Sequence, residues 1–227
     1  MTFKVNWERA HTQHNLPDNV IREMLKITYP DNAVNDYDII SGSCANINVK
    51  VQLKGLTSPI LLRVYLRDPK AARREHKISQ LLLNKVPTPK TYHIGHSCGY
   101  TFAITEYLSG TPLRDYLLND QDINLKNIMF KVGNMLSNIA DIQFDKNGWF
   151  NSELNVTERI TQESMLAFCK EILNSEKLTA ILAIKKRQQI DDVLTRHASL
   201  FPDGHERNLV HADFDPANIL VNKINGI

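Results

Sequence analysis

The chain has 227 residues, with 27 Lys and Arg against 25 Asp and Glu, which gives a formal net charge of +2. This near balance argues against nucleic acid or a membrane surface as the main partner, and 42% hydrophobic with 23% charged residues is typical of a folded globular protein. There is no apolar run near the ~20 residues that a membrane helix needs, no secretory signal at the start, and only three scattered cysteines. We therefore expect a cytoplasmic protein.

The first part of the chain is predicted to be rich in strands. A first helix is expected at about residues 17–27, where Val20, Met24 and Leu25 fall on one face. Patterns typical of strands follow at residues 36–41, 47–54 and 59–66. Short turns of small residues join these segments, which predicts an antiparallel meander.

The remaining elements divide the chain near Gly110. A helix is predicted at about residues 69–84, and the prolines Pro87 and Pro89 end it. Strands are predicted at residues 90–96 and 100–108. Beyond them, helical periodicity covers residues 112–119, 124–142, 158–175 and 177–200, and strand patterns return at 208–211 and 219–221. The fold class is therefore predicted as α+β, with a strand-rich part at residues 1–108 and a mainly helical part at residues 109–227.

Polar residues suited to catalysis gather between the last two predicted strands. His211, Asp213 and Asn218 lie in one short loop. Asp213 is suited to accept a proton from an attacking hydroxyl, and the amide oxygen of Asn218 is suited to bind Mg²⁺. The alternative interpretation is that the aspartate and the asparagine only form a turn.

This loop resembles a known family. The pattern H-x-D-F-x-P-x-N-I-L-V at residues 211–221 resembles the catalytic loop of the aminoglycoside phosphotransferase and choline kinase superfamily, which is related to protein kinases. Other segments resemble that family in the same order along the chain: Leu62-Arg63, Arg74-Glu75, residues 86–89, residues 102–110 and residues 148–150.

The resemblance implies a two-lobed, protein-kinase-like fold. Residues 1–108 would form an antiparallel-sheet, nucleotide-binding N-lobe, and residues 109–227 an incomplete helical C-lobe that ends just after the catalytic loop. Leu61, Arg63 and Tyr65 share one strand face, which in such folds looks into the nucleotide cleft. Arg63 would then meet the phosphates, and Glu75 would hold it through a bidentate ion pair.

The resemblance also implies a phosphate-covering loop and a hinge. The loop would consist of Gly42, Ser43, Cys44, Ala45 and Asn46. The hinge, from Glu106 to Leu108, would bind adenine through its backbone. The alternative interpretation of the loop is an ordinary hairpin turn, and that of the hinge is a strand that ends at a turn. For Arg63 and Glu75 the alternative is a pair of solvated surface charges.

Two departures from the family pattern shape the functional prediction. Asp215 stands where protein kinases carry a lysine, which favours a small-molecule hydroxyl as acceptor over a protein. No Asp or Glu follows Asp215, although the family carries a second metal-binding aspartate there. We therefore expect this chain to be a fragment, or a truncated product, of a longer kinase.

The predicted function is an ATP-dependent phosphotransferase, with GTP as the other donor considered. It would use Mg²⁺ and act on a hydroxyl of an aminoglycoside, an amino alcohol or a sugar derivative. Asp213 is its predicted catalytic residue and Asn218 its metal ligand. The rival hypotheses are an inactive nucleotide-binding or interaction module and a truncated kinase remnant. No nucleic-acid or membrane partner is expected, and the oligomeric state stays open.

Overall fold

The structure, a computed structural model, describes residues 16–40, 46–119 and 124–222. The chain divides into two units, which are described separately: unit 1 comprises Met1–Ile139 and Val210–Ile227, and unit 2 comprises Ala140–Leu209. The lobe boundary predicted at residue 108 stays a prediction. Within the described ranges, the chain has no helix with the length and apolar character that spanning a membrane requires.

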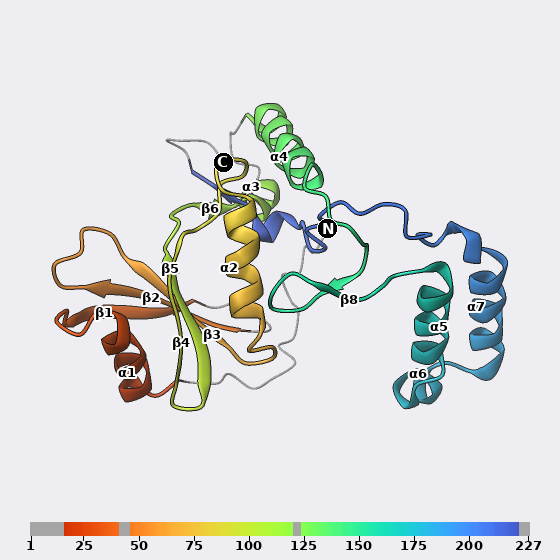
Figure 1. Cartoon of the computed structure of the whole chain (residues 1–227), viewed down its shortest axis with the longest axis horizontal. Coiled ribbons are helices and arrows are strands. Elements are labelled where there is room, and N and C mark those ends of the chain that lie inside the picture. Colours follow the sequence, from red (N-terminus) through yellow and green to blue (C-terminus); the bar gives the residue numbers. More distant parts are fainter. Residues whose placement is uncertain (1–15, 41–45, 120–123, 223–227) are drawn as a thin grey trace. The chain divides into compact units, whose positions relative to one another are not determined.

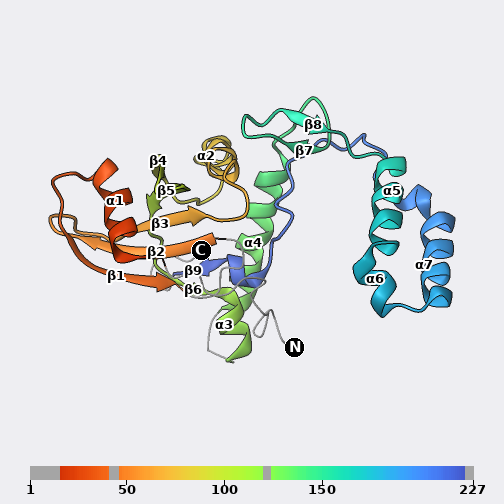
Figure 2. The same cartoon turned by 90° about the horizontal axis from the view of Figure 1, so that it is seen from below.

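Unit 1 contains a five-stranded sheet in which every neighbouring pair of strands is antiparallel (Figures 1 and 2). The strand order is β1-β2-β3-β5-β4, so the predicted meander of the first three strands is confirmed, and β5 then lies between β3 and β4. The strands are β1 Val34–Ile40, β2 Asn46–Leu53, β3 Ile60–Tyr65, β4 Thr91–Ser97 and β5 Tyr100–Glu106.

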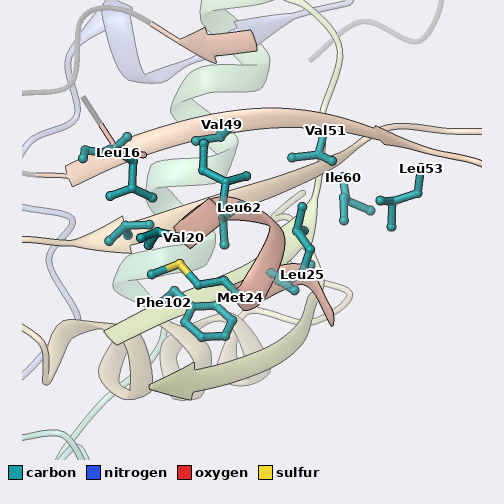
Figure 3. Packing of buried hydrophobic residues seen from close by; sticks show 14 residues of the cluster. Leu16, Val20, Met24, Leu25, Val49, Val51, Leu53, Ile60, Leu62 and Phe102 are labelled. Atoms are coloured by element: carbon teal, nitrogen blue, oxygen red, sulfur yellow. The ribbon is translucent and has the colours of Figure 1, made fainter. Parts of the chain in front are cut away.

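Helix α1 (Asp18–Thr28) covers one face of this sheet. Its stripe of Ile21, Met24 and Leu25 is fully buried, and Figure 3 shows Met24 close to Phe102 of β5. Alternate strand residues form the other half of this core: Val49, Val51, Leu62, Val64, Phe102 and Ile104. The core fixes the strand register, because a slip by one residue would turn these side chains to the opposite face.

Helix α2 (Ala71–Leu81) lies beside β4 and β5 (Figure 1). Its Ala72 packs with Tyr65 of β3 and Ala103 of β5. Val64 packs in the α1 core and Tyr65 packs with α2. Because consecutive side chains of a strand point to opposite faces, α1 and α2 cover different faces of the sheet. The α2 face is the one that also carries Arg63.

A second core of unit 1 joins two helices to a strand near the end of the described chain. Strand β6 (Thr111–Pro112) pairs antiparallel with β9 (Leu220–Val221). Helices α3 (Leu113–Leu118) and α4 (Leu125–Ala140) pack around this pair. The buried residues of this core are Leu113, Tyr116, Ile128, Val132, Ile219 and Val221.

Unit 2 begins with a short strand pair and continues with helices. Strands β7 (Trp149–Phe150) and β8 (Val156–Glu158) are antiparallel. Gly148, just before β7, has a φ of +140°, and the Glu158 carbonyl oxygen leaves no room there for a Cβ atom. The helices are α5 Gln162–Leu173, α6 Glu176–Ile181, α7 Ile184–Arg196 and the 3-10 helix η1 Ala198–Leu200. Helices α5 and α7 lie side by side (Figures 1 and 2).

Two predictions for unit 2 are wrong in detail. The periodicity at residues 177–200 predicts one continuous helix, but the structure has α6 and α7 with a break between them. The break lies at Leu182 and Ala183, whose ψ angles of 121° and 146° are extended. Neither residue is a proline or glycine, so the apolar pattern gives no sign of this turn. The strand predicted at 208–211 is reduced to one bridge between Asn208 and Gln143. The overall sequence of a strand-rich part followed by a mainly helical part is confirmed.

Candidate active site

Asp213 and Asn218 are in direct contact within one loop of unit 1. The Asn218 side-chain nitrogen donates hydrogen bonds to the Asp213 carboxylate Oδ2 (3.1 Å) and to the Asp213 carbonyl oxygen (2.9 Å). These two bonds are both made by the amide nitrogen, and they fix the orientation of the amide group. The structure thus brings together the residue proposed as catalytic and the residue proposed as metal ligand, whose roles stay predictions.

Asp215 folds the backbone that brings these two residues together. Its N–H donates to the Asp213 carbonyl oxygen (2.9 Å), and its own carbonyl accepts from the Asn218 N–H (2.8 Å). Its carboxylate Oδ1 accepts from the Ala217 N–H (2.8 Å), which caps the 3-10 helix η2 (Pro216–Asn218). This single turn carries Asn218 back to Asp213, although five positions separate them in the sequence.

The chain that follows η2 is anchored in the second core of unit 1. The Leu113 N–H donates to the Ile219 carbonyl oxygen (2.8 Å), and Ile219 and Val221 are buried. At Gly110, just before β6, a Cβ atom would lie only 3.2 Å from both the Leu220 Cβ atom and the Val221 carbonyl oxygen. Glycine therefore permits the close approach of the two chain segments that hold the loop.

The backbone before Asp213 is held in an uncommon conformation. Ala212 has a φ of +65°, which costs a residue other than glycine about 1 kcal/mol. The rings of His211 and Phe214 meet edge to face with 5.0 Å between centroids, and Phe214 packs against the second core. Such strain persists where the surroundings impose it, often at functional sites. Asp213 and Asn218 are both exposed, so a ligand can reach them.

Arg63, Glu75 and Tyr65 form a second polar group, on the α2 face of the sheet. The Arg63 Nη1 atom lies 3.4 Å from Glu75 Oε2, so the predicted pairing partners are neighbours. The Tyr65 hydroxyl donates to the same Glu75 oxygen at 2.8 Å. The Arg63 guanidinium carbon also lies 5.6 Å from the centre of the Tyr65 ring, within cation–π range.

Sequence reasoning placed Tyr65 on the face of Arg63 but did not assign it a role. Its side chain is only 4% exposed, and burial, with the adjacent Glu75 charge, raises its pKa well above the ordinary value of 10.0. The hydroxyl therefore stays protonated at neutral pH and can act as a hydrogen-bond donor. The signal available in the sequence was the period-two spacing of Arg63 and Tyr65.

The residues predicted for the hinge and the loop have different surroundings. The Glu106 carboxylate accepts from the Lys90 N–H (3.2 Å), so it joins the ends of β4 and β5, and Leu108 is exposed. Half-buried Leu61 lies opposite Thr105 in the sheet. Asn46 begins β2, opposite Tyr65. The other loop residues, Gly42, Ser43, Cys44 and Ala45, lie outside the described residues.

The donor atoms in the loop fit one ligand position of a magnesium ion. In the described part of the chain, no three His, Cys, Asp or Glu side chains gather as a metal site. Mg²⁺ is often bound by one or two protein oxygens together with water and substrate phosphates. The Asn218 amide oxygen is suited to be such a ligand, because its amide nitrogen is already bonded to Asp213.

Solved structures with a similar fold include aminoglycoside phosphotransferases. The crystal structure of APH(4)-Ia is 18% identical and gives a TM-score of 0.67 over 91% of this chain and 68% of that one. A thermostable mutant of APH(4)-Ia in ternary complex with AMP-PNP and hygromycin B is 19% identical, with a TM-score of 0.66 over 89% and 67%. The gentamicin complex of APH(2")-IIa is 17% identical, with a TM-score of 0.61 over 92% and 67%.

These likenesses confirm the predicted α+β, protein-kinase-like fold. No curated protein sequence matches the chain significantly. A sequence profile described as the phosphotransferase enzyme family (APH) matches residues 37–227, which include Arg63, Glu75 and the loop with Asp213 and Asn218. Since this match extends over most of the chain, the chain belongs to the phosphotransferase enzyme family.

Proposed function

We propose that the chain transfers the γ-phosphate of ATP to a hydroxyl group of a small molecule. The observation that carries the proposal is the Asp213–Asn218 pair, held at 3.1 Å by the capped turn between them. The complexes of the related folds support the two substrate classes: one contains AMP-PNP with hygromycin B, and another contains gentamicin. GTP remains the alternative donor, and amino alcohols and sugar derivatives remain alternative acceptors.

Each polar group has a proposed task. The Asp213 carboxylate accepts the proton of the acceptor hydroxyl and orients that oxygen toward the phosphate. Asn218 holds the loop and contributes its amide oxygen to Mg²⁺, which when bound neutralises charge on the phosphates. Arg63, held by Glu75, contacts the phosphate oxygens. Phosphoryl transfer mainly requires placement and charge compensation, which these few side chains can provide.

The direct test measures phosphorylated product from γ-labelled ATP. The acceptor panel contains hygromycin B, gentamicin, an amino alcohol and an amino sugar, each with and without Mg²⁺. We expect Asp213→Asn to lower kcat by about 10² to 10⁴-fold, because it removes the proton acceptor and keeps the shape of the side chain. Asp141→Asn is the matched control: Asp141 is exposed in the turn after α4, and its variant should keep full activity.

Two outcomes would contradict the proposal. Full activity of Asp213→Asn would remove Asp213 from the catalytic role. If ATP raises the melting temperature of the chain equally with and without Mg²⁺, and no phosphorylated product forms, the nucleotide-binding module is favoured instead.

The cytoplasmic location is also part of the proposal, since the cytoplasm is where the chain would meet ATP.

A further inference from the structure

The tyrosine hydroxyl on β3 makes a firmer contact with Glu75 than the arginine does. The Tyr65 oxygen lies 2.8 Å from Glu75 Oε2, whereas the Arg63 nitrogen lies 3.4 Å from it. Charge-assisted N–H···O bonds are typically 2.7–2.9 Å long. The arginine–glutamate contact is therefore loose, and the tyrosine bond is short.

Tyr65 is also more deeply buried than Arg63 and Glu75. The side chains of Arg63 and Glu75 are 35% and 43% exposed, while Tyr65 is only 4% exposed. Ion pairs as exposed as this one are weak, because water screens the charges and two flexible side chains must be ordered. The Tyr65 side chain packs with Ala72 of α2 and Ala103 of β5. Its hydroxyl can therefore hold the carboxylate in one place.

The ring of Tyr65 contacts the second partner as well. The Arg63 guanidinium carbon lies 5.6 Å from the ring centre, where a cation is attracted to the π-face. One buried side chain thus touches both members of the exposed ion pair. Its hydroxyl is a donor over the whole physiological range, since burial and Glu75 only raise its pKa further above the ordinary value of 10.0.

We infer that Tyr65 is a positioning residue: its hydroxyl fixes the Glu75 carboxylate, and its ring supports Arg63, so that the guanidinium is held ready for the nucleotide phosphates. The inference rests on the proposed function, because phosphate binding by Arg63 belongs to it. In this role Tyr65 acts through Arg63 and Glu75 and needs no contact of its own with the nucleotide. A purely structural tyrosine would contribute to stability alone and would leave nucleotide affinity unchanged.

The first measurement is the affinity for ATP and Mg²⁺ by titration calorimetry on the full chain. Tyr65→Phe keeps the ring and removes only the hydroxyl, and we expect it to weaken binding about tenfold, as the loss of a hydrogen bond to a charged group does. Tyr100→Phe is the matched control, since Tyr100 is a partly buried tyrosine on neighbouring β5 that packs in the α1 core. Its affinity should equal that of the wild type.

A double-mutant cycle then shows whether Tyr65 acts through Glu75. Glu75→Met removes the acceptor, so we expect it to weaken ATP binding by about the same tenfold factor. In the Glu75→Met background, Tyr65→Phe should change the affinity less than about twofold. An equal loss in both backgrounds, or a lower melting temperature with unchanged affinity, would overturn the inference. If Tyr65→Phe fails to fold, the ATP affinity of Glu75→Met still shows whether the Glu75 carboxylate is needed.

A nucleotide-free measurement separates this inference from the proposed function. The NMR signals of the Arg63 Nη–H groups report how firmly the guanidinium is held at Glu75, through their hydrogen exchange with water. We expect about tenfold faster exchange in Tyr65→Phe and no change in Tyr100→Phe. Unchanged exchange in Tyr65→Phe overturns the positioning role. If the wild type binds no nucleotide, the proposed function fails, while this comparison still decides what Tyr65 does for Arg63.

Discussion

The polar side chains of the Asp213 loop differ in the task that their contacts allow. The Asp215 carboxylate accepts from the Ala217 N–H and caps η2, so a change at this residue would loosen the turn itself. The Asp213 carboxylate instead meets the side chain of Asn218 and is exposed to ligands. Of the two aspartates, Asp213 is therefore the better candidate for a proton acceptor. The local role of Asp215 also suffices to explain an aspartate at its position.

Asp68, which precedes α2, predicts a pH effect on stability. The Arg74 side chain donates to Asp68 at 2.7 Å, and this hydrogen bond lowers the pKa of Asp68 below its ordinary value of 3.8. A lowered pKa means that the contribution to stability is complete above pH 3.8 and is lost as the pH falls through the lower value of the folded state. Both side chains are partly exposed, so we expect only about 0.5 kcal/mol.

Urea unfolding of Asp68→Asn measures this contribution. The asparagine keeps an oxygen for the Lys70 N–H, from which Asp68 accepts at 3.0 Å. It loses the charge and the second oxygen, which accepts from Arg74. The variant should be about 0.5 kcal/mol less stable than the wild type at pH 6, with the difference shrinking toward pH 3. Asp31→Asn, in an exposed turn, is the control and should show no such trend. A stability difference that grows as the pH falls would contradict this prediction.

At the scale of elements, local patterns predicted most helices and strands of unit 1. Helix α1 follows from the spacing of Val20, Met24 and Leu25, and β2 follows from the alternation of Ile47, Val49 and Val51. The strand predicted at residues 219–221 is confirmed as β9. Strand β6 and its pairing with β9 were beyond such reasoning, because the pairing joins segments more than 100 positions apart. The break at Leu182 and Ala183 was missed because neither proline nor glycine marks it.

The residues of the candidate site were also predictable only in part from the sequence. Asp213, Asn218, Arg63 and Glu75 were chosen from motifs, and the structure places them as two contacting pairs. The contact of Tyr65 with Glu75 depends on how α2 lies on the sheet, which no local pattern contains. An aromatic residue at the end of an apolar strand is, by its sequence pattern, simply a core residue.

The β6–β9 pair predicts that a substitution outside the loop disturbs the site. At Gly110 a Cβ atom would already be tight against Leu220 and Val221, so Gly110→Val must push β9 away. We expect a loss of about 1–3 kcal/mol in the free energy of unfolding, typical of overpacking, measured by urea denaturation. Because η2 directly precedes β9, turnover should fall as well.

The neighbouring residue provides the control for this substitution. Ser109 is exposed, and Ser109→Val introduces the same side chain one position earlier. It should change the free energy of unfolding by no more than about 0.5 kcal/mol and leave turnover intact. Equal effects of the two variants would show that the close approach at Gly110 does not hold the loop.

At the scale of the whole molecule, buried apolar residues are distributed unevenly between the units. Among the described residues of unit 1, fourteen buried side chains form the core that Leu16, α1 and the large sheet share. Among the described residues of unit 2, only Leu173 and Leu209 are buried apolar side chains. Its helices expose apolar side chains, among them Phe168, Ile172, Ile181, Ile184 and Val193. Packing within unit 2 therefore stabilises these helices much less than packing within unit 1 stabilises the large sheet.

This distribution predicts that the helices of unit 2 open before the large sheet does. Helices α1 and α7 make a matched pair, with 11 and 13 residues: α1 buries Val20, Ile21, Met24 and Leu25, whereas α7 buries no side chain. In hydrogen exchange followed by mass spectrometry, we expect peptides of α7 to be protected at least about tenfold less than peptides of α1, since local opening requires little loss of buried contacts. Strands β2, β3 and β5 should exchange most slowly. Equal protection of α1 and α7 would mean that the helices of unit 2 are stabilised by something other than their own packing.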